Sequence, residues 1–166
     1  QILCPRASFI LINTYRAPSR LFITGRAELS SEEGTTQGDP LAMPFYAVST
    51  SLIISTLRSA SPDVKQVWLA DDASAAGKLQ SLVSYFDSLS AEGKKFGYYV
   101  NEKKSWLILK NEADHQEAKQ IFKNYDIQIT TEGERHLGAA LGSTSFKEKY
   151  ISGKVDQWIK ELDNLC

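Results

Sequence analysis

The feature that most constrains this chain is an apolar segment that ends abruptly on two adjacent carboxylates. Residues 66–76 read QVWLADDASAA, so Asp71 and Asp72 separate large apolar side chains from small ones. Because strand side chains alternate between faces, the apolar run over residues 67–70 predicts a buried strand that turns tightly at the acidic pair. A carboxylate at the boundary of a core costs on the order of several kcal/mol unless it is paired or binds a metal. We therefore expect the apex of a hairpin that can bind a divalent cation.

The composition favours one globular domain. The chain has 166 residues, of which 42% are apolar, and this is enough material for a core. No stretch approaches the roughly 20 apolar residues of a membrane span, and no segment resembles a signal peptide. We expect a soluble intracellular protein, nuclear or cytoplasmic and not secreted. The sequence begins at Gln1 and stops at Cys166 inside a predicted helix, so we expect both ends to lie within a longer protein.

Charge and cysteine content give little indication of partners. The net charge is −1 and the isoelectric point is near 6.2, so any binding to nucleic acid must be local. Clusters of lysine such as Lys103 and Lys104 are ordinary on solvated faces. Cys4 and Cys166 lie at opposite ends of the chain without the spacing of metal ligands, so we expect neither a zinc site nor a disulfide framework.

The predicted elements alternate between helices and pairs of strands. In chain order they are a helix over 4–16, a hairpin over 21–29, a polar loop over 30–44 leading into a helix over 41–58, the acidic hairpin, a helix over 78–92, strands over 98–101 and 105–109, a helix containing residues 118–125, extended segments and a hairpin within 127–141, and a helix from 145. Helices separated by antiparallel pairs predict an α+β fold with helices on one face of an antiparallel sheet. The other face would stay open and could receive a nucleic-acid duplex.

The loop before the second predicted helix is a further candidate for function. Locally, Asp39 before Pro40 is typical of a helix cap with proline at the first helical position. Gly38 would let another backbone or a flat base approach closely, and the Gln37 side chain can donate and accept hydrogen bonds at once. We expect this loop to form the floor of a pocket for a base pair.

Four blocks in this order resemble the palm of reverse transcriptases, especially those of non-long-terminal-repeat retrotransposons. The blocks are QGDPL at 37–41, LADD at 69–72, GYYVNEKKS at 97–105 and HLG at 136–138. The resemblance implies a partial palm over residues 1–145, a ferredoxin-like antiparallel sheet with helices on one face, lacking the fingers and the first metal-binding strand. Residues 146–166 resemble the start of a thumb.

The same resemblance implies roles for single residues. Asp71 would be the main ligand of Mg²⁺ or Mn²⁺ and Asp72 a weaker ligand beside it, both in two-metal nucleotidyl transfer. Lys104 would be a proton donor to the departing pyrophosphate, although on its own it is equally typical of a surface lysine. The remaining residues would contact substrates, namely Gln37, Gly38 and Pro40 the incoming nucleotide and template, and Leu137 and Gly138 the primer backbone.

Two departures from the family pattern limit what the chain could do alone. Leu69 stands where the family usually has Tyr or Phe, which alters packing beneath the primer end but removes no metal ligand. The stretch from Gln1 to Arg16 contains no acid, so the family's other metal-binding aspartate would lie upstream of it. We therefore expect the intact protein to copy an RNA template from a DNA primer with deoxynucleoside triphosphates. The fragment alone, without its upstream fingers and palm segment, should be inactive.

Other classes of function remain open at this point. The main alternative is an inactive mobile-element remnant, or a palm retained as a nucleic-acid-binding or interaction module. An RNA-dependent RNA polymerase commonly has glycine before the acidic pair, where this chain has Ala70. A phosphoacceptor receiver domain needs a further aspartate at a strand end, and Asp114 follows a polar segment that does not resemble a strand.

Overall fold

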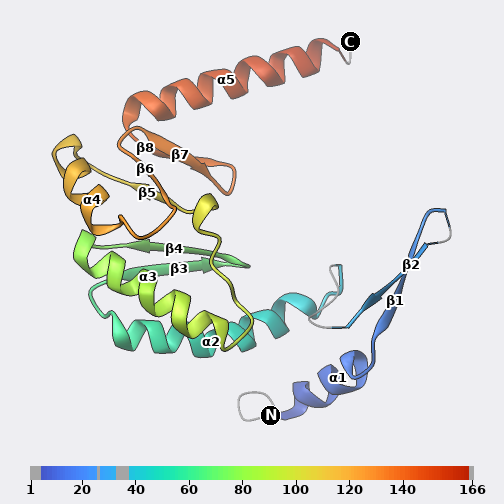
Figure 1. The fold of residues 1–166 in the computed structure, drawn as a ribbon. Coiled ribbons are helices and arrows are strands. Elements are labelled where there is room, and N and C mark those ends of the chain that lie inside the picture. The colour runs from blue at the N-terminus through green and yellow to red at the C-terminus, as the bar shows by residue number, and fades with distance from the viewer. Residues whose placement is uncertain (1–4, 26, 33–37, 165–166) are drawn as a thin grey trace. The chain divides into compact units, whose positions relative to one another are not determined.

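The computed structural model describes residues 5–25, 27–32 and 38–164 (Figure 1). The chain divides into two compact units, Gln1–Tyr98 and Tyr99–Cys166. Over the described residues the fold is a mixture of helices and small, mostly antiparallel sheets, which confirms the α+β class. None of the described helices combines the length and the apolar character needed to cross a membrane.

The first unit opens with a helix and a hairpin at the predicted positions. Helix α1 (Pro5–Tyr15) is followed by strands β1 (Ser19–Ile23) and β2 (Ala27–Ser31), which pair antiparallel. Pro5 occupies the first position of α1, where its missing N–H leaves no hydrogen bond unmade. Gly25 has a φ of 100° in the connection between the strands, a conformation that favours glycine.

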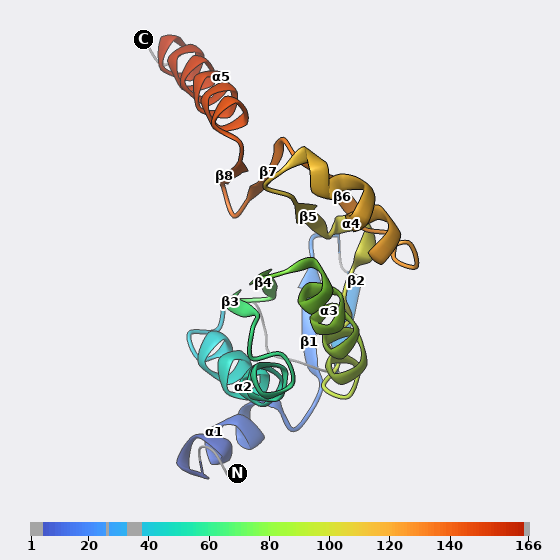
Figure 2. The same ribbon diagram turned by 90° about the vertical axis from the view of Figure 1, so that its left-hand side faces the viewer.

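The core of the first unit lies between two helices and the acidic hairpin. Helices α2 (Ala42–Ala60) and α3 (Leu79–Lys94) lie along one face of the hairpin formed by β3 (Lys65–Leu69) and β4 (Asp72–Ala76), as Figures 1 and 2 show. Apolar residues at helical spacing supply the buried contacts. The buried apolar side chains here are Ile53, Leu57, Val64, Tyr85 and Leu89.

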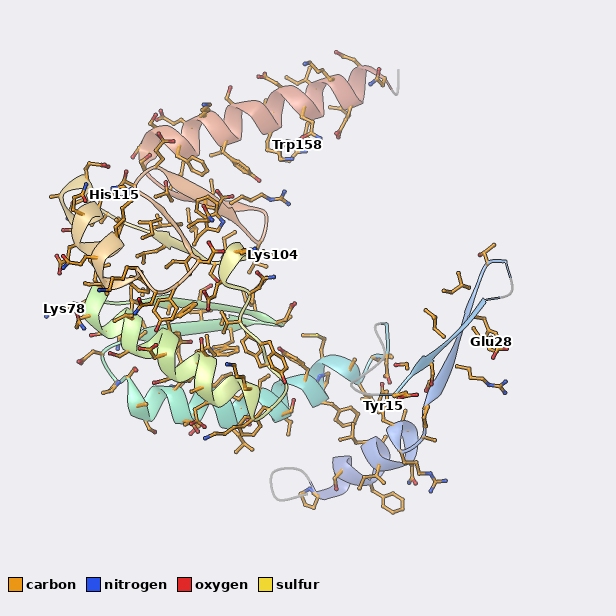
Figure 3. All side chains as sticks on the ribbon, in the orientation of Figure 1. Tyr15, Glu28, Lys78, Lys104, His115 and Trp158 are labelled. Atoms are coloured by element: carbon orange, nitrogen blue, oxygen red, sulfur yellow. The ribbon has the colours of Figure 1, made fainter. Side chains whose placement is uncertain are left out.

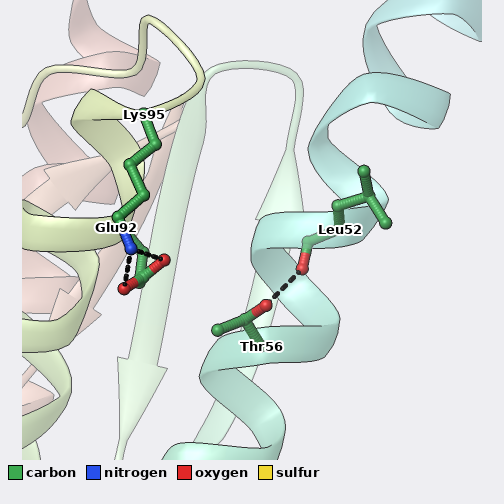
Figure 4. Close-up of polar contacts among 4 residues, drawn as sticks. All are labelled: Leu52, Thr56, Glu92 and Lys95. Carbon is green, nitrogen blue, oxygen red and sulfur yellow. Dashed lines mark hydrogen bonds and ion pairs between the residues drawn. The ribbon is translucent and has the colours of Figure 1, made fainter.

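Several serine and threonine hydroxyls on α2 donate to carbonyl oxygens of the same helix. The buried Thr50 donates to the Tyr46 carbonyl oxygen at 2.9 Å, and Thr56 donates to the Leu52 carbonyl oxygen at 3.0 Å (Figure 4). This local bonding lets a helix rich in Ser and Thr face a core without unpaired donors. Beyond the end of α3, Lys95 forms an ion pair with Glu92, also drawn in Figure 4, at 2.7 Å.

The prediction that residues 67–70 are buried is wrong. Gln66 and Trp68 face the helices and are partly covered, whereas Val67 and Leu69 are 59% and 54% exposed. Alternation along the strand explains the difference, because a two-stranded hairpin with helices on one side leaves every second side chain uncovered. The outward face is thus apolar but open.

The second unit contains two short sheets and a long terminal helix. Its elements are the 3₁₀ turns η1 (Glu102–Lys104) and η2 (Glu112–Asp114), helices α4 (His115–Ile121) and α5 (Thr144–Asp163), and strands β5 (Trp106–Ile108), β6 (Gln128–Thr130), β7 (Gly133–His136) and β8 (Ala139–Gly142). Leu109, Ala118 and Phe122 are its buried apolar residues. Strands β7 and β8 form a hairpin that turns at residues 137–138, within the segment 136–141 that the sequence predicts to be extended.

Two expectations about strands are corrected here. Residues 98–101 form no strand, because the Tyr98 N–H donates to the Gly93 carbonyl oxygen and Asn101 caps η1. Strand β5 instead pairs in parallel with β6, across the connection that contains α4. In place of the single antiparallel sheet expected, the described residues form four two-stranded sheets.

Candidate functional site

The acidic pair lies at a tight turn, as predicted. Leu69 pairs with Asp72, which leaves Ala70 and Asp71 as a two-residue loop between β3 and β4. Ala70 has a φ of 53°, in the left-handed region that alanine rarely adopts. Asp71 and Asp72 are both exposed. By register, Asp72 shares the outward face of the hairpin with Leu69.

Tyr98 contacts this turn from beyond the end of α3. Its hydroxyl donates to the backbone carbonyl oxygen of Asp71 at 2.9 Å. Its ring packs against Trp68 with centroids 5.4 Å apart and planes tilted by 56°. The sequence patterns placed Tyr98 within a family block but assigned it no role. An aromatic residue directly after Gly97 was the only local signal of this contact.

Tyr46 on α2 completes a cluster of four ionisable groups. Burial raises the pKa of Tyr46, and the charge of Asp71 raises that pKa further. The pKa of Tyr98 is raised to about 12, first by burial and then by Tyr46, Asp71 and Asp72. Asp71 therefore raises the pKa values of both phenols at the loop end of the hairpin, and Asp72 raises that of Tyr98. Figure 1 shows this loop end directed toward the end of α2 at which the helix begins.

An amide beneath the hairpin connects it to both helices. The Gln66 side chain donates to the Ile54 carbonyl oxygen of α2 at 3.3 Å and accepts from the Trp68 indole N–H at 2.9 Å. The Tyr85 hydroxyl of α3 lies 3.5 Å from the same Gln66 oxygen, and burial raises the pKa of Tyr85 to about 12. Gln66 and Trp68 thus link α2 to the ring of Tyr98, which in turn contacts the acidic turn.

The turn before α2 is fixed by Asp39. One carboxylate oxygen of Asp39 accepts from the Leu41 N–H at 2.8 Å, and the other accepts from the Tyr15 hydroxyl of α1; Figure 3 labels Tyr15. These two bonds, that from Tyr15 first, lower the pKa of Asp39. The predicted cap by Asp39 is wrong, because Leu41 is the N-cap residue of α2 and no side chain caps it; Asp39 instead closes the turn before the helix. Pro40 is an exposed turn residue and the helix begins only at Ala42.

The base-pocket prediction rests mainly on residues that the structure does not describe. Gln37 lies outside the described residues. Gly38 is exposed with a φ of 93°, and no described atom lies within 4 Å of where a Cβ would stand. Among the described residues, none therefore fills the space beside the Gly38 backbone, and its contact with a base pair stays a prediction.

The other predicted site residues belong to the second unit. Lys104 is the exposed last residue of η1, labelled in Figure 3, and its backbone N–H donates to the Asn101 side chain at 3.3 Å. Leu137 and Gly138 form the two-residue loop between β7 and β8, with φ values of 51° and 84°. Positive φ at both positions is typical of a type I′ hairpin turn. The Tyr150 hydroxyl of α5 donates to the Gly138 carbonyl oxygen at 3.2 Å and holds this loop.

The acidic turn suits part of a magnesium site. Asp71 and Asp72 offer oxygen ligands, and Mg²⁺ in proteins is often held by one or two carboxylates together with water and substrate phosphates. Within the described part of the chain, no group of three or more His, Cys, Asp or Glu side chains is placed to hold a metal ion. The pair would therefore share a cation with ligands from elsewhere.

Comparison with known proteins adds no assignment. No protein-family model matches the chain, and no curated protein or solved structure is significantly similar to it.

Proposed function

We propose that this chain is the palm of an RNA-directed DNA polymerase and that its acidic turn holds the divalent cation of nucleotidyl transfer. The observation that supports the proposal best is the geometry of that turn. Asp71 and Asp72 occupy the apex of an exposed hairpin, beside Tyr46 on the helix that follows the Gly38 turn. The acidic block and the helix that follows the Gly38 turn thus belong to one unit.

The residues around the turn suit a nucleic-acid end. Beyond Asp72, strand β4 carries only Ala73, Ser74, Ala75 and Ala76, whose small side chains leave room for a bulky substrate. Val67 and Leu69 present apolar surface on the outward face of the same hairpin. A sugar or base could lie against this surface while its terminal hydroxyl approaches the carboxylates.

The chemistry requires a metal that the two carboxylates would hold. Mg²⁺ or Mn²⁺ would lower the pKa of the primer 3′ hydroxyl and stabilise charge on the transferred phosphoryl group. Asp71 and Asp72 would bind and orient the ion. The turn closed by the hydrogen bonds of Asp39 would keep Gly38 in place for the incoming nucleotide and its template partner. In this proposal, Lys104 would donate a proton to the departing pyrophosphate. Leu137 and Gly138 would contact the primer backbone.

A second candidate is a palm retained as a nucleic-acid-binding or interaction module without catalysis. It is favoured by the observation that the described residues place no third acidic ligand beside the pair. The two candidates differ in one measurable respect. An enzyme extends a primer, whereas a binding module retains the template and leaves the primer unchanged.

The test is primer extension by the full-length protein on an RNA template with deoxynucleotides and Mg²⁺. We expect Asp71→Ala to lower the extension rate by more than about 100-fold, since losing an outer-shell partner of a metal already costs about 10- to 100-fold. Asp72→Ala should lower it less. Asp63→Ala, which removes an exposed acid from the turn after α2, is the matched control.

Two results would count against the enzyme. Full activity in both the Asp71 and the Asp72 variant would remove the acidic turn from the mechanism. Tight binding of the primed template without any extension would favour the binding module.

A further inference from the structure

We infer that Tyr98 is a positioning residue for the acidic turn, because its hydroxyl fixes the peptide unit that joins Asp71 to Asp72. The inference rests on the proposed function, since the two carboxylates are its metal ligands. It adds a residue to which neither the sequence patterns nor the family resemblance assigns a role.

The bonded atom explains why this contact controls both carboxylates. The Asp71 carbonyl oxygen accepts from Tyr98 at 2.9 Å and belongs to the same planar unit as the Asp72 backbone nitrogen. Holding that plane restricts ψ of Asp71 and φ of Asp72 together. The directions in which the two side chains leave the backbone are then fixed relative to each other, as a shared metal requires.

The turn needs such an anchor because its own conformation is unfavourable. Ala70 at a φ of 53° costs roughly 1–2 kcal/mol relative to the right-handed region. An isolated two-stranded hairpin is marginal in water, and its loop end is free to change shape. A hydrogen bond from outside the hairpin opposes that change at the position where the carboxylates are attached.

Tyr98 is itself held firmly enough to act as the anchor. Its N–H donates to the Gly93 carbonyl oxygen at 2.9 Å, and its ring packs on Trp68. Gly97 reverses the chain with a φ of 74°. Gly93 is buried, and a Cβ there would lie 2.7 Å from the Tyr98 carbonyl oxygen. The two glycines therefore do more than end α3, because they return the chain to the acidic turn.

The charge state of the phenol supports its role as a donor. Burial raises the pKa of Tyr98 to about 12, and the carboxylates of Asp71 and Asp72 add to the shift by opposing a second negative charge. The hydroxyl keeps its proton at neutral pH.

The experiment titrates the chain with Mn²⁺ and follows paramagnetic broadening of the Asp71 and Asp72 amide signals by NMR. Tyr98→Phe removes the hydroxyl and keeps the ring against Trp68. We expect its Mn²⁺ affinity to fall by about 10-fold, because losing a residue that orients a metal ligand typically lowers metal affinity by at least that factor. The carbonyl carbon shift of Asp71, measured without metal, should move as well. Tyr99→Phe removes a hydroxyl from the adjacent, 71% exposed residue and should change neither signal.

The outcomes separate this inference from the proposed function. Unchanged Mn²⁺ affinity in Tyr98→Phe would overturn the positioning role and leave the metal site intact. An unmoved Asp71 carbonyl shift would overturn it too, since the hydrogen bond would then be absent in solution. If the unaltered chain shows no broadening at the hairpin, the metal site itself is overturned, and the inference falls with it.

Discussion

At the scale of single residues, backbone conformation at the two hairpin loops is the most informative feature. Ala70 and Leu137 both have positive φ although neither is glycine. For a bulky residue such as Leu137, this conformation is uncommon, and residues held in this way often mark functional positions. Both lie in loops that the proposed function places against substrate or metal.

Relieving the strain at Ala70 should stabilise the chain. Ala70→Gly removes the Cβ that makes the left-handed conformation costly, so we expect the free energy of unfolding to rise by about 0.5–1 kcal/mol. Ala75→Gly, in the adjacent strand, is the matched control and should lower it by a similar amount. Urea unfolding measures both. Destabilisation by Ala70→Gly would show that the turn has another conformation in solution.

At the scale of elements, the acidic hairpin depends on contacts from α2, from α3 and from the segment after α3. Tyr46 comes from α2, Tyr85 from α3 and Tyr98 from the segment after α3, and burial is the first cause of the raised pKa of each phenol. Packing of α2 and α3 is therefore what shields the phenols beneath the acidic turn. The hairpin by itself would leave them in water.

This shielding predicts a loss of stability at high pH. The pKa values of Tyr85 and Tyr98 rise from 10.0 to about 12 on folding, so the unfolded chain releases these protons first as the pH increases. The contribution of both phenols is fully present below about pH 10 and is lost as the pH rises toward 12. Urea unfolding across this range should show a falling free energy.

Removing the phenols should flatten that dependence. In Tyr85→Phe/Tyr98→Phe the decrease in unfolding free energy between about pH 10 and 12 should be shallower than in the unaltered chain. Each single variant should give an intermediate slope. A double variant with the original slope would contradict the assignment, since other groups would then account for the titration.

At the scale of the whole molecule, exposed apolar surface stands out. On α5, residues spaced four and three apart form a stripe that includes Ile151, Trp158 and Leu162, which are 58%, 57% and 61% exposed. Stripes of this kind normally pack against another surface. Contiguous exposed apolar patches favour association between molecules.

Charge placed in this stripe should make the chain more soluble. We expect Trp158→Lys to reduce concentration-dependent light scattering while leaving the helix content measured by circular dichroism unchanged. Gln157→Lys adds the same charge at a neighbouring position outside the stripe and is the matched control. Equal scattering by the two variants would indicate that net charge, and not the apolar stripe, controls association.

The sequence by itself determined the features that depend on near neighbours. Helices follow the 3.6-residue spacing of apolar side chains, and the acidic turn follows from an apolar run that meets Asp71 and Asp72. Asp39 could be recognised as a residue of the turn before α2 because its bond to Leu41 spans two residues, although it does not cap the helix. These interactions join residues that are close together in the sequence, so local sequence patterns can predict them.

Only the tertiary structure decided which faces are covered and which distant groups meet. The outward exposure of Val67 and Leu69 depends on a helical layer being present on one side only. The bond between Tyr98 and Asp71 joins residues 27 positions apart, and the parallel pairing of β5 with β6 spans a helix. Periodicity describes a residue and its immediate neighbours, whereas such contacts form only when packing brings remote segments together.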